Sequence, residues 1–314
     1  MTPQEFANAV LAHQRFVAGR TGGKRAELRF VNLSGLRFPR INLSGAILTG
    51  INLSRSTLHD ADLGFADMFC ANMSGCDAQG SNFFRADMRG VQLHGAKLRG
   101  ANLSEADLRP GTLSGTERRM LADLSETDLD DAKLNGANMV ETTLAGASMK
   151  RVEMKGAAVI RSNLAGADLT GANLEGANIQ NADLSNAVLA QANLRFAKFN
   201  GSNFKGVALK DVDLSGADVR DSQMARRIDS LPPDIQTVEK GQSAWPTSLA
   251  GADLSGADLS DSDLRGIKLD GANLRGANLA RANLEGASLV RTDLSVANTT
   301  DAAMPGTSAP GKAN

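Results

Sequence analysis

The chain has 314 residues, 42% of them hydrophobic, which excludes a wholly disordered protein and allows one large domain or two smaller ones. With one Trp, no Tyr, and Leu and Ala as its main apolar residues, it lacks the aromatic anchors around which a large globular core usually forms. Its 34 basic and 35 acidic residues give a formal charge of −1, which argues against nucleic-acid binding and against a strongly acidic surface.

Residues 1–23 contain a predicted helix. Thr2 and Glu5 match a capping box, with Pro3 at the first helical position, and Gly19 is expected to end the helix. An apolar stripe at helical spacing consists of Phe6, Ala9, Val10, His13, Phe16 and Val17. There is no basic n-region before an apolar run, and no stretch of the roughly 20 apolar residues that a membrane span needs. We therefore expect a cytoplasmic protein that does not contact a membrane.

From residue 24 onward, the sequence repeats every five residues. Large apolar residues occupy every fifth position in three runs, with Ala78 as the one exception among 49 positions. The runs cover positions 28–113, 124–224 and 249–294. Two residues before each large residue, a second column is small, usually Ala, Ser or Thr, and includes Cys76. Cys76 is therefore interpreted as a small buried residue and not as a reactive thiol.

This period suits neither a straight helix nor a straight strand. On a helix, successive repeats rotate by about 140°, and on a strand an odd period sends successive side chains to opposite faces. If the chain turns a corner after each repeat, however, every large residue can point to a common axis. The small residue two positions earlier shares that inward face. The pattern therefore predicts a β-solenoid filled by its own side chains and stabilised by stacking of its coils.

The repeat resembles a known family through motifs such as Ala167-Asp168-Leu169 and Ala172-Asn173-Leu174. It strongly resembles the pentapeptide-repeat family, over 49 repeats or 245 of the 314 residues. The resemblance implies an all-β fold, a right-handed quadrilateral parallel β-helix with four repeats per coil. Solenoids need their open ends covered, so the helix within 1–23 is expected to be an N-terminal cap.

The first repeat section, 24–224, has a predicted register break at 114–123. Leu113 and Leu124 are eleven positions apart instead of ten, so one extra residue is expected to form a bulge or small loop. The tip of this loop carries Glu117, Arg118 and Arg119. A solvated loop is the preferred interpretation, and a contact with a partner is the alternative.

A second interruption is predicted at 225–248, which contains three prolines and the single Trp. It is either a hinge or a segment that packs back on the solenoid. A second repeat section follows at 249–299, and residues 300–314 are expected to be a disordered tail.

Outward positions are polar nearly everywhere, but Phe65, Phe69 and Phe84 follow central positions and should be exposed. If residues 20 apart stack, Phe65 lies above Arg85, and Phe69 above Arg89. These five residues are the candidate partner-binding site, because aromatic and Arg side chains are enriched at interface hot spots. The alternative is that the rings only cover the backbone at the corners, or that the N-terminal segment lies across them.

No catalytic, metal or cofactor site is expected. The three histidines, His13, His59 and His94, lie in the helix and on two different outward faces, so no His-centred acid/base or nucleophilic group is predicted. The carboxylates lie at outward repeat positions, where a solvating role is the ordinary one. The glycines follow the five-residue period and mark corners rather than a phosphate-binding loop.

The predicted function is a non-catalytic scaffold or adaptor, bacterial in origin, that binds a protein partner through its solenoid faces and does not bind nucleic acid directly. The alternative, which the resemblance implies, is a DNA mimic that binds or protects DNA gyrase or topoisomerase. A mimic should carry a sustained negative surface, whereas residues 24–113 carry a charge of +3. The sequence indicates neither the identity of the partner nor the oligomeric state.

Overall fold

The computed structural model of the chain divides into two compact units, Met1–Asn163 (unit 1) and Leu164–Asn314 (unit 2). The predicted interrupting segment 225–248 lies outside the residues that the structure describes. The described residues are 1–112, 119–199, 201–204, 207, 212, 249, 254–257, 259–260, 262 and 264–306.

Helix α1 spans Pro3–Val17 at the start of unit 1. The Glu5 N–H donates to the Thr2 hydroxyl oxygen (3.2 Å), and the Thr2 N–H donates to the Glu5 carboxylate (2.7 Å). The capping box predicted from the sequence is therefore present, with Pro3 in the first turn. No helix in the described part of the chain is long and apolar enough to cross a bilayer.

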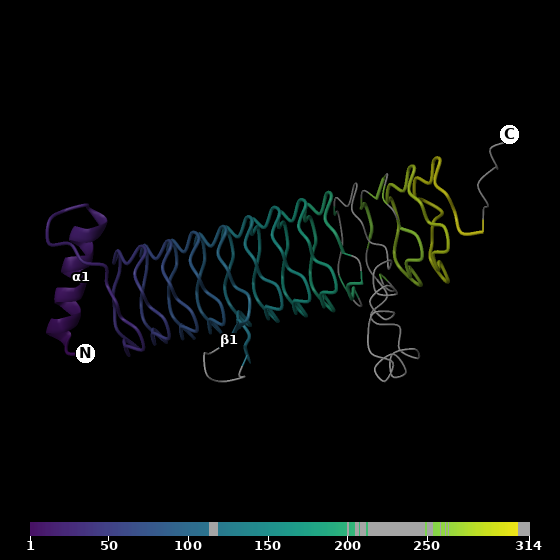
Figure 1. Cartoon of the computed structure of the whole chain (residues 1–314). Coiled ribbons are helices and arrows are strands. Elements are labelled where there is room, and N and C mark those ends of the chain that lie inside the picture. Colours follow the sequence, from purple (N-terminus) through teal and green to yellow (C-terminus); the bar gives the residue numbers. More distant parts are fainter. Residues whose placement is uncertain are drawn as a thin grey trace, which may run out of the picture. The chain divides into compact units, whose positions relative to one another are not determined.

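Helix α1 lies against the beginning of the coil, as Figure 1 shows in purple. The Lys24 N–H donates to the Ala12 carbonyl (3.0 Å), and the Phe6 and Phe38 ring centroids are 5.1 Å apart. The helix is thus joined to the coil by a backbone hydrogen bond and by an aromatic contact.

The coil of unit 1 is held by parallel bridges between residues 20 apart. Glu27 pairs with Ile47, and Ile47 pairs in turn with Asp67. One coil therefore contains four five-residue repeats. The chain turns at the last residue of each repeat, where φ is positive: Gly45 (φ 69°) and Phe65 (φ 58°) occupy one corner in successive layers. Because the chain bends so often, the ladder consists of single bridges and not of long strands.

The core is built from the two inward columns that the sequence predicts. Leu63 and Ala61, two residues earlier, are both buried, and so is Cys76 in the small column. Where this column contains Ser or Thr, the hydroxyl forms hydrogen bonds with the backbone. Ser81 Oγ, for example, donates to the Leu58 carbonyl (2.5 Å) and accepts from the Ala61 N–H (3.2 Å). Polar residues in the small column therefore do not leave buried groups without hydrogen bonds.

The first interruption is larger than the sequence indicated. Gln92 pairs with Asp123, 31 positions later, instead of with a residue 20 positions later, so the insertion adds 11 residues. Within it, β1 (Gly111–Thr112) pairs antiparallel with β2 (Arg119–Met120), beside the coil in Figure 1. An interruption is therefore present where the break at 114–123 is predicted, but the prediction of a single extra residue is wrong.

The physical reason lies just before β1. The Leu108 N–H still donates to the Asn138 carbonyl (2.7 Å), so Leu108 belongs to the coil. Pro110 stands at the next corner, and it has no N–H with which to continue the ladder. The coil resumes at Ala122, which is buried. Leu113, counted as a repeat position from the sequence, lies outside the described residues, as do Glu117 and Arg118.

Unit 2 has the same parallel spacing of 20 residues, as in the bridges of Asp168 with Val188 and of Lys268 with Ser288. The ladder continues to Ala303, which pairs with Asn283. The sequence-based end of the second section at 299 is therefore too early by at least four residues. Residues 307–314, the remainder of the predicted tail, lie outside the described part.

Candidate partner-binding surface

Three of the five candidate residues form one contact group at a corner of unit 1. Phe65 and Phe84 meet edge to face, with ring centroids 5.5 Å apart and an interplanar angle of 89°. The Arg85 guanidinium carbon lies 5.1 Å from the centre of the Phe84 ring. Phe65 is 54% exposed. We call Phe65, Phe84 and Arg85 the Phe65 cluster.

The repeat places these side chains together through the ladder. The Phe65 N–H donates to the Phe84 carbonyl (2.8 Å), so the two residues lie in adjacent layers of one corner. Arg85 is held further by Glu105 in the next layer, with 2.6 Å between Arg85 Nε and Glu105 Oε2. The Phe65 cluster is therefore ordered by its neighbours, and it leaves one aromatic face open to solvent.

The other two candidates, Phe69 and Arg89, form a separate pair at the next corner. The Arg89 guanidinium carbon is 5.4 Å from the Phe69 ring centre. Arg89 also donates twice to Asp87, at 2.8 and 2.6 Å, and this bidentate bond raises the pKa of Arg89. A Cβ atom at Gly111 would lie 2.8 Å from Phe69 Cε2, so the Phe69 ring packs against the backbone of β1.

The five candidate residues therefore form two separate contact groups and not one continuous site. Asp67 follows Phe65 by two residues and precedes Phe69 by two, and it belongs to a column of carboxylates that continues through Asp87 and Asp107. This acidic column separates the two groups. The 20-residue spacing of the repeat predicts that Phe65 and Arg85 lie in adjacent layers, but nothing in it predicts that Phe69 packs against an inserted hairpin.

Arginines neutralise the acidic column. Arg109 donates twice to Asp107, at 2.9 and 2.7 Å, and Arg89 lies 3.9 Å from the same carboxylate. Burial alone would raise the pKa of Asp107, but the bonds from Arg109 lower it. The face between the two groups is thus a network of alternating charges and not a negative stripe.

Of the three phenylalanines predicted to be exposed, Phe65 is exposed, but Phe69 and Phe84 are half-buried. Two other phenylalanines, Phe30 and Phe196, are exposed and stand apart. Phe30 is 73% exposed, and its ring lies over Gly50 of the next layer. Phe196, in unit 2, has the Arg195 guanidinium carbon 5.3 Å from its ring centre. An exposed ring at a corner is therefore common in this chain, whereas a pair of rings in contact at one corner distinguishes the Phe65 cluster.

One histidine contact is not predictable from the repeat. His94 Nδ1 lies 2.9 Å from Ser125 Oγ, and Ser125 Oγ donates to Asp123 Oδ1 (2.5 Å). The contact cannot be inferred from the 20-residue spacing, because the insertion shifts the stacking partner of His94 by 11 positions along the sequence. Since the serine proton points to Asp123, the imidazole is not placed to remove it, and the arrangement lacks the geometry of an activated nucleophile.

Two further titratable groups, His59 and Cys76, are accounted for by their surroundings. His59 Nε2 lies 2.7 Å from Asp77 Oδ1 at an outward position. Burial raises the pKa of Cys76 to about 12, which keeps it as a thiol. Among the described residues, no group of three or more His, Cys, Asp or Glu side chains could hold a metal ion.

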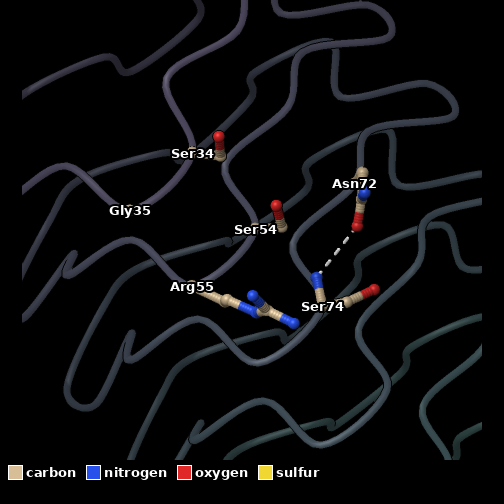
Figure 2. A pocket seen from close by; sticks show the side chains of 6 residues that line it. All are labelled: Ser34, Gly35, Ser54, Arg55, Asn72 and Ser74. Atoms are coloured by element: carbon tan, nitrogen blue, oxygen red, sulfur yellow. Dashed lines mark hydrogen bonds between the residues drawn. The ribbon is translucent and has the colours of Figure 1, made fainter.

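A shallow polar pocket of about 430 Å³ lies on another face of unit 1. Figure 2 shows the Asn72 side chain accepting a hydrogen bond from the Ser74 N–H (3.1 Å), with Arg55 alongside. Its lining consists of Ser34, Gly35, Ser54, Arg55, Asn72 and Ser74. The pocket offers hydroxyl and guanidinium donors but no carboxylate, so it could accept an anionic group.

A sequence-family model for pentapeptide repeats, eight copies long, matches the chain over 26–116, 122–224 and 247–304. The chain belongs to the pentapeptide-repeat family. The family repeats thus cover both units, and their gap at 117–121 coincides with the inserted hairpin. Among curated proteins, no sequence matches the chain.

Solved pentapeptide-repeat structures are similar to the chain. HetL, involved in heterocyst differentiation regulation in the cyanobacterium Nostoc, is 26% identical over 88% of this chain and 94% of its own, with a TM-score of 0.36. QnrB1, a plasmid-mediated fluoroquinolone resistance protein, is 20% identical over 62% and 86%, with a TM-score of 0.36. Rfr23 from the cyanobacterium Cyanothece is 30% identical over 40% and 85%, with a TM-score of 0.18.

Proposed function

We propose that this pentapeptide-repeat chain is a non-catalytic scaffold or adaptor that binds a protein partner through a face of its solenoid. The proposal includes a right-handed, four-sided coil, for which the spacing of 20 residues between bridged positions is the support. It also includes α1 as the N-terminal cap. His13 of α1 is buried, and its Nδ1 accepts a hydrogen bond from the Ala26 N–H (3.1 Å) at the first coil.

The observation that carries the proposal is the Phe65 cluster. An exposed phenylalanine in contact with a second ring and near an arginine has the composition of an interface hot spot. Phe84 and Glu105 already hold the cluster in place, so a partner that binds there does not have to order these side chains. Phe69 and Arg89 contribute differently, because they hold β1 against the coil beside the cluster.

A cross-linking pull-down with wild-type chain and a Phe65→Ser, Phe84→Ser variant tests this proposal. The matched control is Phe30→Ser, which removes a more exposed but isolated ring. We expect a partner that the wild type and the control capture and that the double variant loses. With that partner purified, the affinity of the double variant should fall by roughly 30-fold, as for loss of a hot spot.

Two results would count against the proposal. Identical captures by all three proteins would mean that Phe65 and Phe84 have a structural role and do not bind the partner. Capture of gyrase or topoisomerase subunits, unchanged in the double variant, would favour the DNA-mimic alternative instead. Circular dichroism of each variant establishes beforehand that the solenoid is intact.

A further inference from the structure

The charges of the chain are distributed unevenly. Residues 1–59 contain eight basic residues and only two acidic ones, Glu5 and Glu27, for a net charge of +6. Residues 60–314 carry −7, so the near-neutral total conceals a basic first fifth. The basic residues are Arg15, Arg20, Lys24, Arg25, Arg29, Arg37, Arg40 and Arg55. They belong to α1, to the segment after it, and to the first two coils.

Most of these cations have no partner within the described part of the chain. Arg15, Arg20, Lys24, Arg37 and Arg40 are all exposed, and no ion pair or side-chain hydrogen bond is made by any of them. Arginines of later coils differ, since Arg85, Arg89, Arg99 and Arg109 each contact a carboxylate. The positive charge at the N-terminal end of unit 1 is therefore available to an external anion.

Apolar side chains are exposed at the same end. Six of the eleven large hydrophobic residues that are exposed in the described part lie within 1–36. They are Met1, Leu11, Phe16, Val17, Phe30 and Leu36. Exposed apolar side chains that gather in one region of a folded protein are characteristic of interaction sites. Here they share residues 1–36 with cations that have no partner among the described residues.

A groove of about 330 Å³ lies between α1 and the first coil. Asn8, Ala9 and Ala12 line it from α1, and Lys24, Arg25 and Glu27 line it from the coil. The short alanine side chains leave room beside two cations. A carboxylate on an incoming chain could reach Lys24, while a neighbouring aliphatic side chain contacts the alanines.

We infer that the N-terminal end of unit 1, α1 with the first two coils, is a second docking surface, which binds an acidic segment of a protein that also carries aliphatic side chains. This surface, formed by residues 1–59, shares no residue with the Phe65 cluster, and it goes beyond the proposed function because it gives the adaptor two sites of different chemistry. Charge complementarity determines the kind of partner: cations without partners attract carboxylates.

Two other anionic partners are less consistent with this surface. A bilayer would need a broad apolar helix face, but the side of α1 that carries exposed Leu11 also carries Gln4, Asn8 and Arg15. A nucleic acid binds mainly through its phosphates, and exposed Leu11 and Leu36 would add nothing to such contacts. A partner with both carboxylates and aliphatic groups uses the whole surface.

The test measures binding of a fluorescent peptide rich in Glu and Leu, and of a counterpart in which Gln replaces every Glu. The variant Arg15→Glu, Arg37→Glu, Arg40→Glu reverses three cations at the proposed surface. Its matched control reverses three exposed cations elsewhere and changes the net charge equally: Lys97→Glu, Lys133→Glu, Arg275→Glu. Circular dichroism shows whether each variant is folded. Hydrogen exchange of the Ala26 amide, which donates to buried His13, shows whether α1 is still docked.

We expect the wild type to bind the Glu peptide in a salt-dependent manner and the Gln peptide much more weakly. The N-terminal triple variant should lose about tenfold in affinity, and the control triple variant should stay within about twofold. Phe65→Ser, Phe84→Ser should bind the Glu peptide like the wild type. This last result separates the inference from the proposed function, since either surface can fail without the other.

Several outcomes would overturn the inference. The wild type could fail to bind the Glu peptide, or both triple variants could weaken binding equally, which would indicate an effect of net charge alone. Tighter binding to single-stranded DNA, or to vesicles of phosphatidylserine and phosphatidylcholine, would assign the surface to a nucleic acid or a membrane. Concentration-dependent self-association, abolished in the N-terminal triple variant, would assign it to a second copy of the chain.

Discussion

At the scale of single residues, Asp130 shows how the coil uses a carboxylate for structure. Its side chain is 8% exposed. Asp130 Oδ1 accepts from Ser148 Oγ (2.6 Å) and from the Lys150 N–H (2.9 Å), while Oδ2 accepts from Arg99 (2.8 Å). Burial would raise the pKa of Asp130, but these donors lower it. The carboxylate therefore joins its own layer to the layers on both sides.

Asp130→Ala should lower the free energy of unfolding of unit 1 by about 1–3 kcal/mol, because the half-buried Ser148 hydroxyl and Lys150 N–H lose their acceptor. Urea unfolding followed by circular dichroism measures the change. The control is Asp131→Ala, which removes an exposed carboxylate paired with Arg151 and should cost less than about 1 kcal/mol. Equal effects of the two substitutions would show that Asp130 contributes no more than a surface ion pair.

The corners show where residue-scale prediction succeeds and where it stops. Stacking at 20-residue intervals is a property of the repeat, so the contact of Phe65 with Phe84 and the position of Arg85 could be inferred from the sequence. The contact of Phe69 with Gly111 could not, since it depends on the path of an inserted segment that has no repeat. The pairing of His94 with Ser125 was hidden for the same reason.

At the scale of elements, the hairpin and the helix differ in how well the sequence specifies them. The capping box of α1 is local, so the helix was predicted with its first residues correct. For the insertion that contains β1 and β2, the sequence predicts only one extra residue, because Leu113 matches the apolar column. An 11-residue insertion equals two five-residue repeats plus one residue. The five-residue period is therefore shifted by only one position, and the other ten residues leave it unchanged.

Helix α1 also contains a titratable contact. His13 Nδ1 accepts from the Ala26 N–H (3.1 Å), so this nitrogen must be unprotonated when the helix is docked. Burial lowers the pKa of His13; the Ser44 carbonyl opposes this shift and the Arg25 charge reinforces it. Phe16 stacks on the ring at 5.9 Å. A folded-state pKa below that of the unfolded chain means that protonation favours release of the helix.

Docking of α1 should therefore be fully stable above a pH of about 6.5, the ordinary pKa of histidine, and should weaken as the pH falls below it toward the folded-state pKa. Hydrogen exchange of the Ala26 amide between neutral and mildly acidic pH measures this. His13→Gln, which can accept from Ala26 without titrating, should remove the dependence in this range. The same pH profile in both proteins would mean that another group controls the docking.

At the scale of the whole molecule, the repeat predicts that each coil is stabilised mainly by the coils next to it. Each coil contacts only the coils on either side, so a solenoid behaves as a chain of nearest-neighbour contacts. The Leu63 N–H donates to the Asn82 carbonyl in the next layer, and the Leu63 side chain is wholly buried. The clustering of contacts within each of the two compact units agrees with this prediction.

Leu63→Ala should therefore destabilise unit 1 by about 3–5 kcal/mol, through loss of buried surface and the cavity left behind. Hydrogen exchange should accelerate at Leu43 and Phe83, in the adjacent layers, and remain unchanged at Leu279 in unit 2. The reciprocal variant, Leu279→Ala, should accelerate exchange in unit 2 alone. If either substitution accelerated exchange equally in both units, the two would unfold as one cooperative structure, and nearest-neighbour contacts would not suffice to describe the stability of this chain.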